Sequence, residues 1–330
     1  MRWVLVTPVA RFSYFFIVAV LVLAGLTHLG TPLVAVFFSY FALRKLRFGR
    51  KRWLSIVLFI ILVTLVLYGA GFLIREAVIA LPKIAGEVVP PVIAYAQEHG
   101  FELPFSDWDT LKTSILDTVR DEFLLVGNFA RSASRQLVFV LIAIVVAVSL
   151  FIRSSFEPLT AVPTAPNLFT AVTDEIRARF QLFYQSFETV MGAQILISAI
   201  NTVLTAVFVV AISLKYIPLV VGLTFFCGLL PIVGNLISNS VIVGIASTES
   251  FRAAIAALVF LVLLHKLEYF LNSKIIGGRI KNPMWLTLLA LVVGERFMGI
   301  PGMILAPVVL HYIKVETSRL PPPEPRRTAI

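Results

Sequence analysis

Eight apolar stretches, separated by more polar segments, dominate the chain. A stretch of about 18 or more apolar residues with few charges is typical of a helix that crosses a bilayer. Apolar residues follow one another continuously in these stretches and do not alternate with polar ones, which indicates helices rather than strands. The pattern therefore predicts an all-α integral membrane protein, a polytopic helical bundle with the lipid bilayer as its partner. The stretches cover residues 12–29, 31–43, 54–74, 137–152, 190–213, 217–246, 253–271 and 284–313.

Composition and charge agree with this class. Of the residues, 59% are hydrophobic and 14% charged, against roughly 45–50% and about 25% in ordinary globular domains. The net charge of +10 gathers in short loops between the stretches and after the last one. Because short loops rich in Lys and Arg stay on the cytoplasmic side, the membrane explains the charge without a nucleic-acid partner. Both termini are then expected in the cytoplasm.

The polar segments divide the chain into successive parts. The first stretch has no cleavage site of small residues and more spans follow it, so we interpret it as an uncleaved span rather than a signal peptide. The turn to the second stretch is expected at residues 30–32. The parts are an N-terminal three-span scaffold (1–75), an external amphipathic helical segment (76–136), a fourth span plus a cytoplasmic helix (137–189), a transport half (190–316) and a disordered, Pro-rich cytoplasmic tail (317–330).

Two of these parts contain helix signals outside the apolar stretches. In the external part, the sequence SDWD predicts a capping box before an apolar face formed by Leu111, Ile115, Val119 and Phe123. We interpret that helix as a soluble cap, with a dimer contact as the alternative. In the cytoplasmic part, TDEIRARFQLFYQSFETVMGAQ predicts one helix that continues into the next span and carries an apolar face of Phe180, Phe183 and Phe187.

The stretches 217–246 and 284–313 are too long for single spans. Each would measure about 45 Å as one straight helix, whereas the hydrocarbon core is about 30 Å thick. Each is interrupted in its middle, the first by Pro231 and Gly234, the second by Gly299 and Gly302. The charge rule places both ends of the first outside and both ends of the second inside. We therefore predict two re-entrant or broken helical hairpins, an arrangement that indicates a transporter's site near the midplane.

Ionisable groups at membrane depth are candidates for function. Glu295 and Arg296 lie in the second hairpin, and Glu268 lies near the inner end of stretch 253–271. A charge in hydrocarbon costs at least about 2.5–3.5 kcal/mol and normally has a partner. Glu295 either ties the hairpin together through Arg296 or a backbone amide, or binds substrate or a proton. For Glu268 the alternative is an interfacial pair with Lys266 or Lys274.

Amide side chains provide a second set of candidates. Gln194 and Asn201 lie seven residues apart on one helix face, Asn235 and Asn239 lie four apart at the tip of the first hairpin, and Asn272 follows Glu268 by four. Such residues are either interhelical hydrogen-bonding groups or the polar lining of a path for a small hydroxylated solute.

Other functional classes have little support in the sequence. There is no phosphate loop for ATP, no zinc-protease motif, no nucleophile elbow and no membrane aspartate pair. The four histidines have no metal-ligand spacing. Because Cys227 is the single cysteine, no disulfide can form within the chain, and we interpret this residue as a packing residue. We expect neither an enzyme nor a cofactor or metal. A passive channel remains possible, because hairpins also line pores.

Four motifs resemble those of the AI-2E family of bacterial membrane proteins, also called PerM or UPF0118. They are GAQ at 192–194, LLPIVGN at 229–235, KLEYFLNSKIIGGRIKNP at 266–283 and VGERFMGIPGMILAP at 293–307. The first 190 residues match only in layout. The chain departs from the family's pattern at Asn235, Ser273 and Asn282.

The resemblance implies an exporter, in the bacterial cytoplasmic (inner) membrane, of a small solute such as the quorum-sensing signal autoinducer-2. Some family members are instead assigned to sodium–proton antiport. The resemblance also implies a homo-oligomer, such as a pentameric ring, in which the hairpin-bearing half moves against a scaffold.

We therefore predict a secondary transporter, with a channel-like or structural membrane protein as the alternative. Replacement of Glu295 by Gln is expected to leave the protein folded but without gradient-driven transport. If Glu295 proves to be structural, Glu268 is the next candidate.

Overall fold

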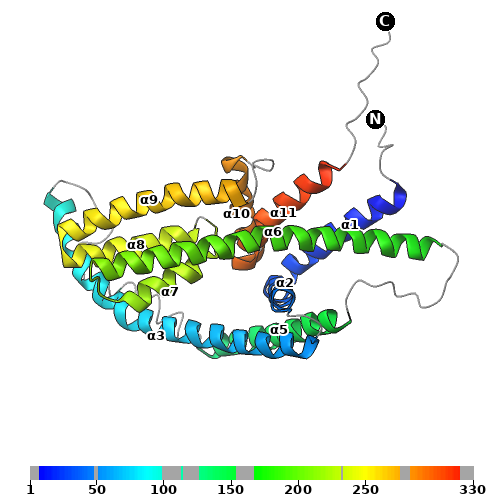
Figure 1. Ribbon diagram of the computed structural model, residues 1–330, viewed down its shortest axis with the longest axis horizontal. Helices are drawn as coiled ribbons and strands as arrows, with labels where there is room; N and C mark the ends of the chain where they lie inside the picture. Colours follow the sequence, from blue (N-terminus) through cyan, green and yellow to red (C-terminus); the bar gives the residue numbers. More distant parts are fainter. Residues whose placement is uncertain are drawn as a thin grey trace, which may run out of the picture. The chain divides into compact units, whose positions relative to one another are not determined.

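The computed structural model describes residues 7–47, 51–98, 113, 126–153, 167–231, 233–275 and 283–319, and the regular structure in these ranges is α-helical (Figure 1). In chain order the helices are α1 (Pro8–Leu26), α2 (Gly30–Lys45), α3 (Arg52–Glu98), α5 (Val126–Ile152), α6 (Leu168–Ala211), α7 (Ile217–Gly228), α8 (Val233–Glu249), α9 (Phe251–Ile275), α10 (Met284–Met298) and α11 (Ile300–Thr317).

Four helical segments of the described chain are long and apolar enough to cross a membrane: Pro8–Leu26, Arg52–Pro91, Arg135–Ile152 and Leu168–Ala211. Large apolar side chains on their surfaces are exposed, as in Phe15 on α1, Leu65 on α3 and Val145 on α5. Burial inside the protein does not explain this composition, and contact with lipid does. The predicted fold class, an all-α polytopic membrane protein, is confirmed.

The turn between α1 and α2 lies earlier than expected, at residues 27–29 instead of 30–32. The Thr27 hydroxyl donates to the carbonyl oxygen of Leu23 at 2.6 Å, and His28 takes a left-handed conformation with φ 57°. Gly30 already begins α2. Pro32 then falls in the first turn of the helix, where its missing N–H removes no helical hydrogen bond.

Helix α6 confirms that the helix predicted before the fifth apolar stretch and the stretch itself are one element. It begins at Leu168, five residues before the motif that predicted it. Asn167 caps the helix, because its Oδ1 accepts from the backbone N–H of Thr170 at 2.9 Å. Phe183 and Phe187 of the predicted apolar face are 2% and 0% exposed, so this face packs on the protein.

Much of the predicted external segment lies outside the described residues, including SDWD and its apolar face at Leu111, Ile115, Val119 and Phe123. On its two sides, α3 continues to Glu98 and α5 covers Val126–Ile152. Helix α3 therefore passes the end of its apolar stretch at residue 74 without a break, although it contains Pro82, Pro90 and Pro91.

The chain forms two compact units. One consists of Met1–Ile56, Val140–Gly192 and Ile276–Ile330, and the other of Val57–Phe139 and Ala193–Ile275. We call them the α10–α11 unit and the α7–α9 unit after the helices that only one of them contains. The predicted hairpins lie one in each. Assignment of residues 190–316 as the transport half stays a prediction.

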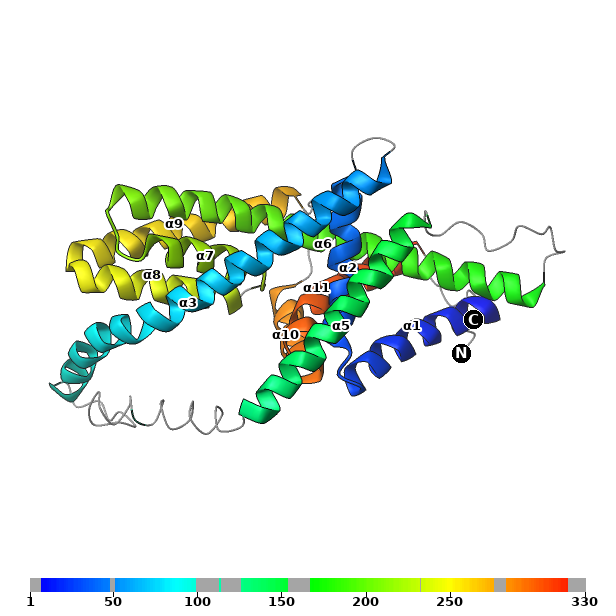
Figure 2. The ribbon, with the colours of Figure 1, turned by 90° about the horizontal axis from the view of Figure 1, so that it is seen from below.

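Each unit has its own hydrophobic core. In the α7–α9 unit, α3, α6, α7, α8 and α9 meet around buried residues such as Val209, Leu219 and Ile245, and Figures 1 and 2 show α7, α8 and α9 beside the C-terminal half of α6. In the α10–α11 unit, the N-terminal half of α6 packs against α2 and α11 around Phe187 and Val308.

Candidate functional site

The first predicted hairpin is present as α7 and α8, which pack against each other. Helix α7 ends at Gly228, and α8 begins at Val233 after a turn that contains Pro231, whose carbonyl oxygen accepts from the N–H of Val233 at 2.7 Å. A Cβ on Gly234 would overlap the carbonyl oxygen of Cys227. Only glycine allows the two backbones this approach, which sets the position of Asn235 immediately afterwards.

Asn235 is directed at the carboxylate of Glu268 on α9. Its Nδ2 donates to both oxygens of that carboxylate, at 2.9 Å to Oε1 and 2.8 Å to Oε2. Asn201 of α6 donates from its own Nδ2 to Oε2 at 3.3 Å. Residues from three helices thus converge on one partly buried carboxylate in an apolar bundle. We call Glu268, Asn235 and Asn201 the polar triad.

Oxygen atoms without partners lie beside the triad. Asn201 is 4% exposed and Thr205, one helical turn further along α6, is 0% exposed. Among the described residues, neither the Oδ1 of Asn201 nor the Oγ1 of Thr205 has a hydrogen-bond partner. Buried polar atoms are normally paired. The free lone pairs of these two buried oxygens can accept a hydrogen bond from a donor or contact a cation.

The N-terminal part of this same α6 face holds the end of α7. The Nε2 of Gln194 donates to the carbonyl oxygen of Gly228 at 2.6 Å, and the Ser198 hydroxyl donates to that of Phe225 at 2.7 Å. The last carbonyls of a helix have no partner within it. Gln194 and Ser198 supply those partners, so they fix the point at which the first hairpin breaks.

The chemistry of the triad follows from its donors. Two amide groups donate hydrogen bonds to the Glu268 carboxylate, and neither amide brings a neutralising positive charge. An incoming proton, or a cation in its place, would neutralise Glu268. The triad therefore presents a carboxylate whose described partners are uncharged, together with amide groups that can hydrogen-bond a polar solute.

The alternative partners expected for Glu268 find no support in the described part of the chain. Lys266 forms no ion pair with it there, and the side chain of Lys274 lies outside the described residues. The side chain of Asn272 also lies outside them. Asn239 is partly buried, and its side chain forms no hydrogen bond with the described residues.

The second predicted hairpin is present as α10 and α11, in the other unit. Gly299 joins the helices with φ 65°, a conformation that residues with a side chain rarely adopt. Pro301 occupies the first turn of α11, as expected. A Cβ on Gly302 would overlap the carbonyl oxygen of Gly294. This hairpin, like the first, is closed by direct contact between two backbones.

Glu295 and Arg296 lie in the last turn of α10. Both side chains are exposed, and they form no ion pair with each other in the described structure. The backbone carbonyl of Glu295 accepts from the N–H of Gly299 at 2.6 Å. Of the predicted site residues, Gln194, Asn201, Pro231, Gly234, Asn235 and Glu268 are brought together in the α7–α9 unit. Glu295, Arg296, Gly299 and Gly302 form a separate group in the α10–α11 unit.

A buried charged cluster in the α10–α11 unit was not predicted. The Oε1 of Glu316 on α11 accepts from the hydroxyl of Tyr14 on α1 at 2.5 Å and lies 3.1 Å from the guanidinium of Arg179 on α6. Arg179 also pairs with Glu175 at 3.0 Å. The apolar pattern hid Glu316, because it follows the last stretch and resembles part of the polar tail. Ser198 and Thr205 were missed too, although Gln194, Ser198, Asn201 and Thr205 recur at helical spacing.

Two comparisons bear on function. Residues 5–320 match the protein family described as AI-2E family transporter. A curated relative described as "Putative transport protein YdbI", from Bacillus subtilis (strain 168), is 32% identical over 128 residues, which is 37% of this chain and 36% of the relative. The match thus spans about a third of that relative's length.

Proposed function

Because the chain belongs to the AI-2E family of transporters, we propose that it is a secondary transporter that exports a small polar solute, such as an autoinducer-2-like signalling molecule. The match over nearly the whole chain supports transport as the function, and no substrate follows from it. We place the protein in the bacterial cytoplasmic membrane, as the family resemblance implies, and both termini inside, because of the distribution of basic loops.

The polar triad is the observation on which the mechanism rests. Glu268 has two hydrogen bonds from Asn235 and one from Asn201, and no ion pair in the described structure. An intramembrane carboxylate without a permanent counter-charge is costly to keep as a purely structural group. It is well suited to a temporary counter-charge, and we assign to Glu268 the binding of the coupling proton or cation.

Asn235 couples this binding to the first hairpin. It lies next to Gly234, the point of closest approach between α7 and α8, so a shift of this hairpin moves an amide that holds the carboxylate. Protonation of Glu268 removes the charge that attracts the Asn235 N–H groups. The hairpin tip is then less tightly held, which is the local change a transport cycle requires.

The second hairpin contributes exposed charges. We propose that Glu295 and Arg296, next to the Gly299 turn, contact the solute along its path. Because both side chains are exposed, they are available to a ligand without breaking an existing ion pair between them. The assembly expected is a homo-oligomer, such as a pentamer.

Sodium–proton antiport is the second candidate function. The unpartnered Oδ1 of Asn201, a residue that contacts the Glu268 carboxylate, favours it, because carboxylate and amide oxygens are among the ligands that hard cations prefer. In this version the cation is the transported species rather than the coupling ion.

Purified protein in liposomes tests the proposal with a panel of polar solutes and monovalent cations, each measured with and without an imposed proton gradient. Secondary transport predicts solute flux that follows the gradient and collapses when a protonophore is added. Proton-linked sodium movement without solute flux would identify the antiporter. Flux indifferent to every gradient would contradict coupling and identify a channel.

A further inference from the structure

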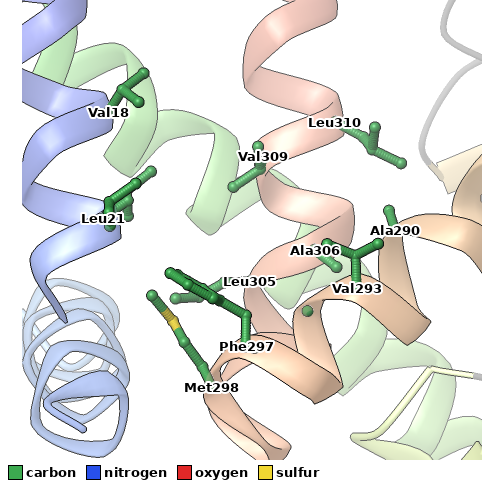
Figure 3. A pocket seen from close by; sticks show the side chains of 13 residues that line it. Val18, Leu21, Ala290, Val293, Phe297, Met298, Leu305, Ala306, Val309 and Leu310 are labelled. Atoms are coloured by element: carbon green, nitrogen blue, oxygen red, sulfur yellow. The ribbon is translucent and has the colours of Figure 1, made fainter. Parts of the chain in front are cut away.

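An apolar groove of about 330 Å³ lies in the α10–α11 unit, between α1 and the α10–α11 hairpin (Figure 3). Its floor is formed by small or buried residues of the hairpin, including Leu305 and Ala306, which are 3% and 8% exposed. Val18 on α1 and Val293 on α10 form its rims and are 57% and 59% exposed. The groove is therefore open along the molecular surface rather than sealed inside the unit.

The lining contains no polar side chain. It consists of aliphatic residues, glycines, the ring of Phe297 and the thioether of Met298. Pockets that bind polar small molecules hold a few placed polar groups that fix the orientation of the ligand. This groove offers none, so it does not suit the polar solute or ion of the proposed function. Its occupant is a hydrocarbon.

The position of the groove on a candidate membrane span indicates the source of this hydrocarbon. Helix α1 is one of the four segments able to cross a membrane, and the groove begins on it at Val18, within that segment. An open apolar groove at this depth faces the acyl chains of the bilayer. If it stayed empty, the atoms lining it would lose their contacts on one side.

The dimensions favour a single chain over a helix of another protein. Along α11 the lining runs from Gly302 to Leu310, roughly 12 Å at a rise of about 1.5 Å per residue. The ring of Phe297 lies directly on Gly25 of α1 and closes one end. A helix with its side chains is about 10–12 Å across, so a segment of the groove's length would occupy far more than the groove's volume of about 330 Å³. The small residues Gly294 and Gly302, which could admit one, already contact each other.

We propose that this groove binds one acyl chain of a membrane phospholipid. The acyl chain lies between α1 and the α10–α11 hairpin, makes contacts that no protein atom of the described residues makes, and thereby holds the hairpin against α1. The bound lipid is a structural component of the transporter and not its cargo. This assignment stands on the groove alone and does not depend on the identity of the solute or on the role of Glu268.

Photo-crosslinking tests the assignment directly. The protein is reconstituted in vesicles of a phospholipid with a photoactivatable diazirine on one acyl chain, irradiated, digested and mapped by mass spectrometry. Labels are expected on the faces of α1, α10 and α11 that line the groove, at about tenfold the level on the exposed face of α5 around Val145. A tenfold preference corresponds to about 1.4 kcal/mol of binding free energy. Uniform labelling of all exposed apolar faces would overturn the proposal, and this outcome needs no variant.

A filled-groove variant adds a second arm. Val18→Trp combined with Val293→Trp places bulk at two exposed rim positions, where it can enter the groove without disturbing the buried floor. Groove labelling should fall to the α5 level, while Val145→Trp, a matched change at a position that is 67% exposed, should leave it unchanged. Persistent labelling in the double variant, or disulfide crosslinks between copies through Val18→Cys in a Cys227→Ala background, would show that a lipid chain is not the occupant.

Discussion

At the scale of single residues, the Glu268 carboxylate depends on amide donors that come from distant parts of the sequence. Asn201 is 67 residues away in the chain and Asn235 is 33. Helical periodicity identified each of these residues as polar in an apolar stretch. It could not pair them, because periodicity describes one helix at a time, and it suggested neighbouring lysines as the partners instead. The same limit hid Glu316, whose partners Tyr14 and Arg179 lie on other helices.

The first prediction concerns Asn235. Asn235→Ala removes two of the three hydrogen bonds to Glu268, and bonds to a charged group are worth about 1.5–3 kcal/mol each. The variant should unfold at lower temperature in detergent and lose most of its driven flux in liposomes. Ser240→Ala is the control, because in the described structure the Ser240 hydroxyl donates to the carbonyl of Leu236 on its own helix. Equal behaviour of the two variants would remove Asn235 from the mechanism.

At the scale of the helical elements, both interrupted stretches form hairpins, as the sequence predicted. Gly299 and Pro301 perform the expected turn and helix start, and Pro231 lies in the turn before α8. These features depend on residues close together in the chain, so the sequence alone is enough to predict them. The length of α3 was underestimated, because the end of an apolar stretch marks the end of lipid contact and not the end of a helix.

A second prediction belongs to the first hairpin. In Gly234→Ala the new methyl group overlaps the carbonyl of Cys227, so α7 and α8 must separate. Overpacking of this kind costs about 1–3 kcal/mol, and displacement of Asn235 should abolish driven transport. Gly71→Ala is the matched control, because nothing lies within 4 Å of its new methyl group, and alanine in a helix is favoured over glycine. A normal melting temperature for Gly234→Ala would contradict the close approach of the two backbones.

At the scale of the whole molecule, a polytopic helical membrane protein follows from apolar stretches alone, and its structure confirms it. The division into two compact units did not follow from them, because the units combine segments far apart in the chain: Val140–Gly192 belongs with both ends of the sequence. Sequence order suggested consecutive parts. Long-range packing around cores such as those at Phe187 and Ile245 decides the grouping instead.

Membrane topology gives the third prediction. In a Cys227→Ala background, single cysteines at Tyr216 and Thr248 should both react with an impermeant thiol reagent from outside, because the charge rule predicts that the first hairpin begins and ends on that side. Cysteines at Pro283 and Lys314 should react only from inside. Labelling of either pair from opposite sides would contradict the re-entrant arrangement and leave two ordinary spans in its place.

The central claim is that Glu268 carries the coupling charge, and gradient-driven flux through Glu268→Gln in liposomes tests it most directly. Glutamine keeps the size of the side chain and cannot exchange a proton. The control is Glu249→Gln, the same change at a carboxylate that pairs with Lys215 at 3.1 Å at the end of α8. We predict that Glu268→Gln inserts and assembles as the unmodified protein does but loses driven flux, while Glu249→Gln keeps it. Normal driven flux through folded Glu268→Gln would contradict the account.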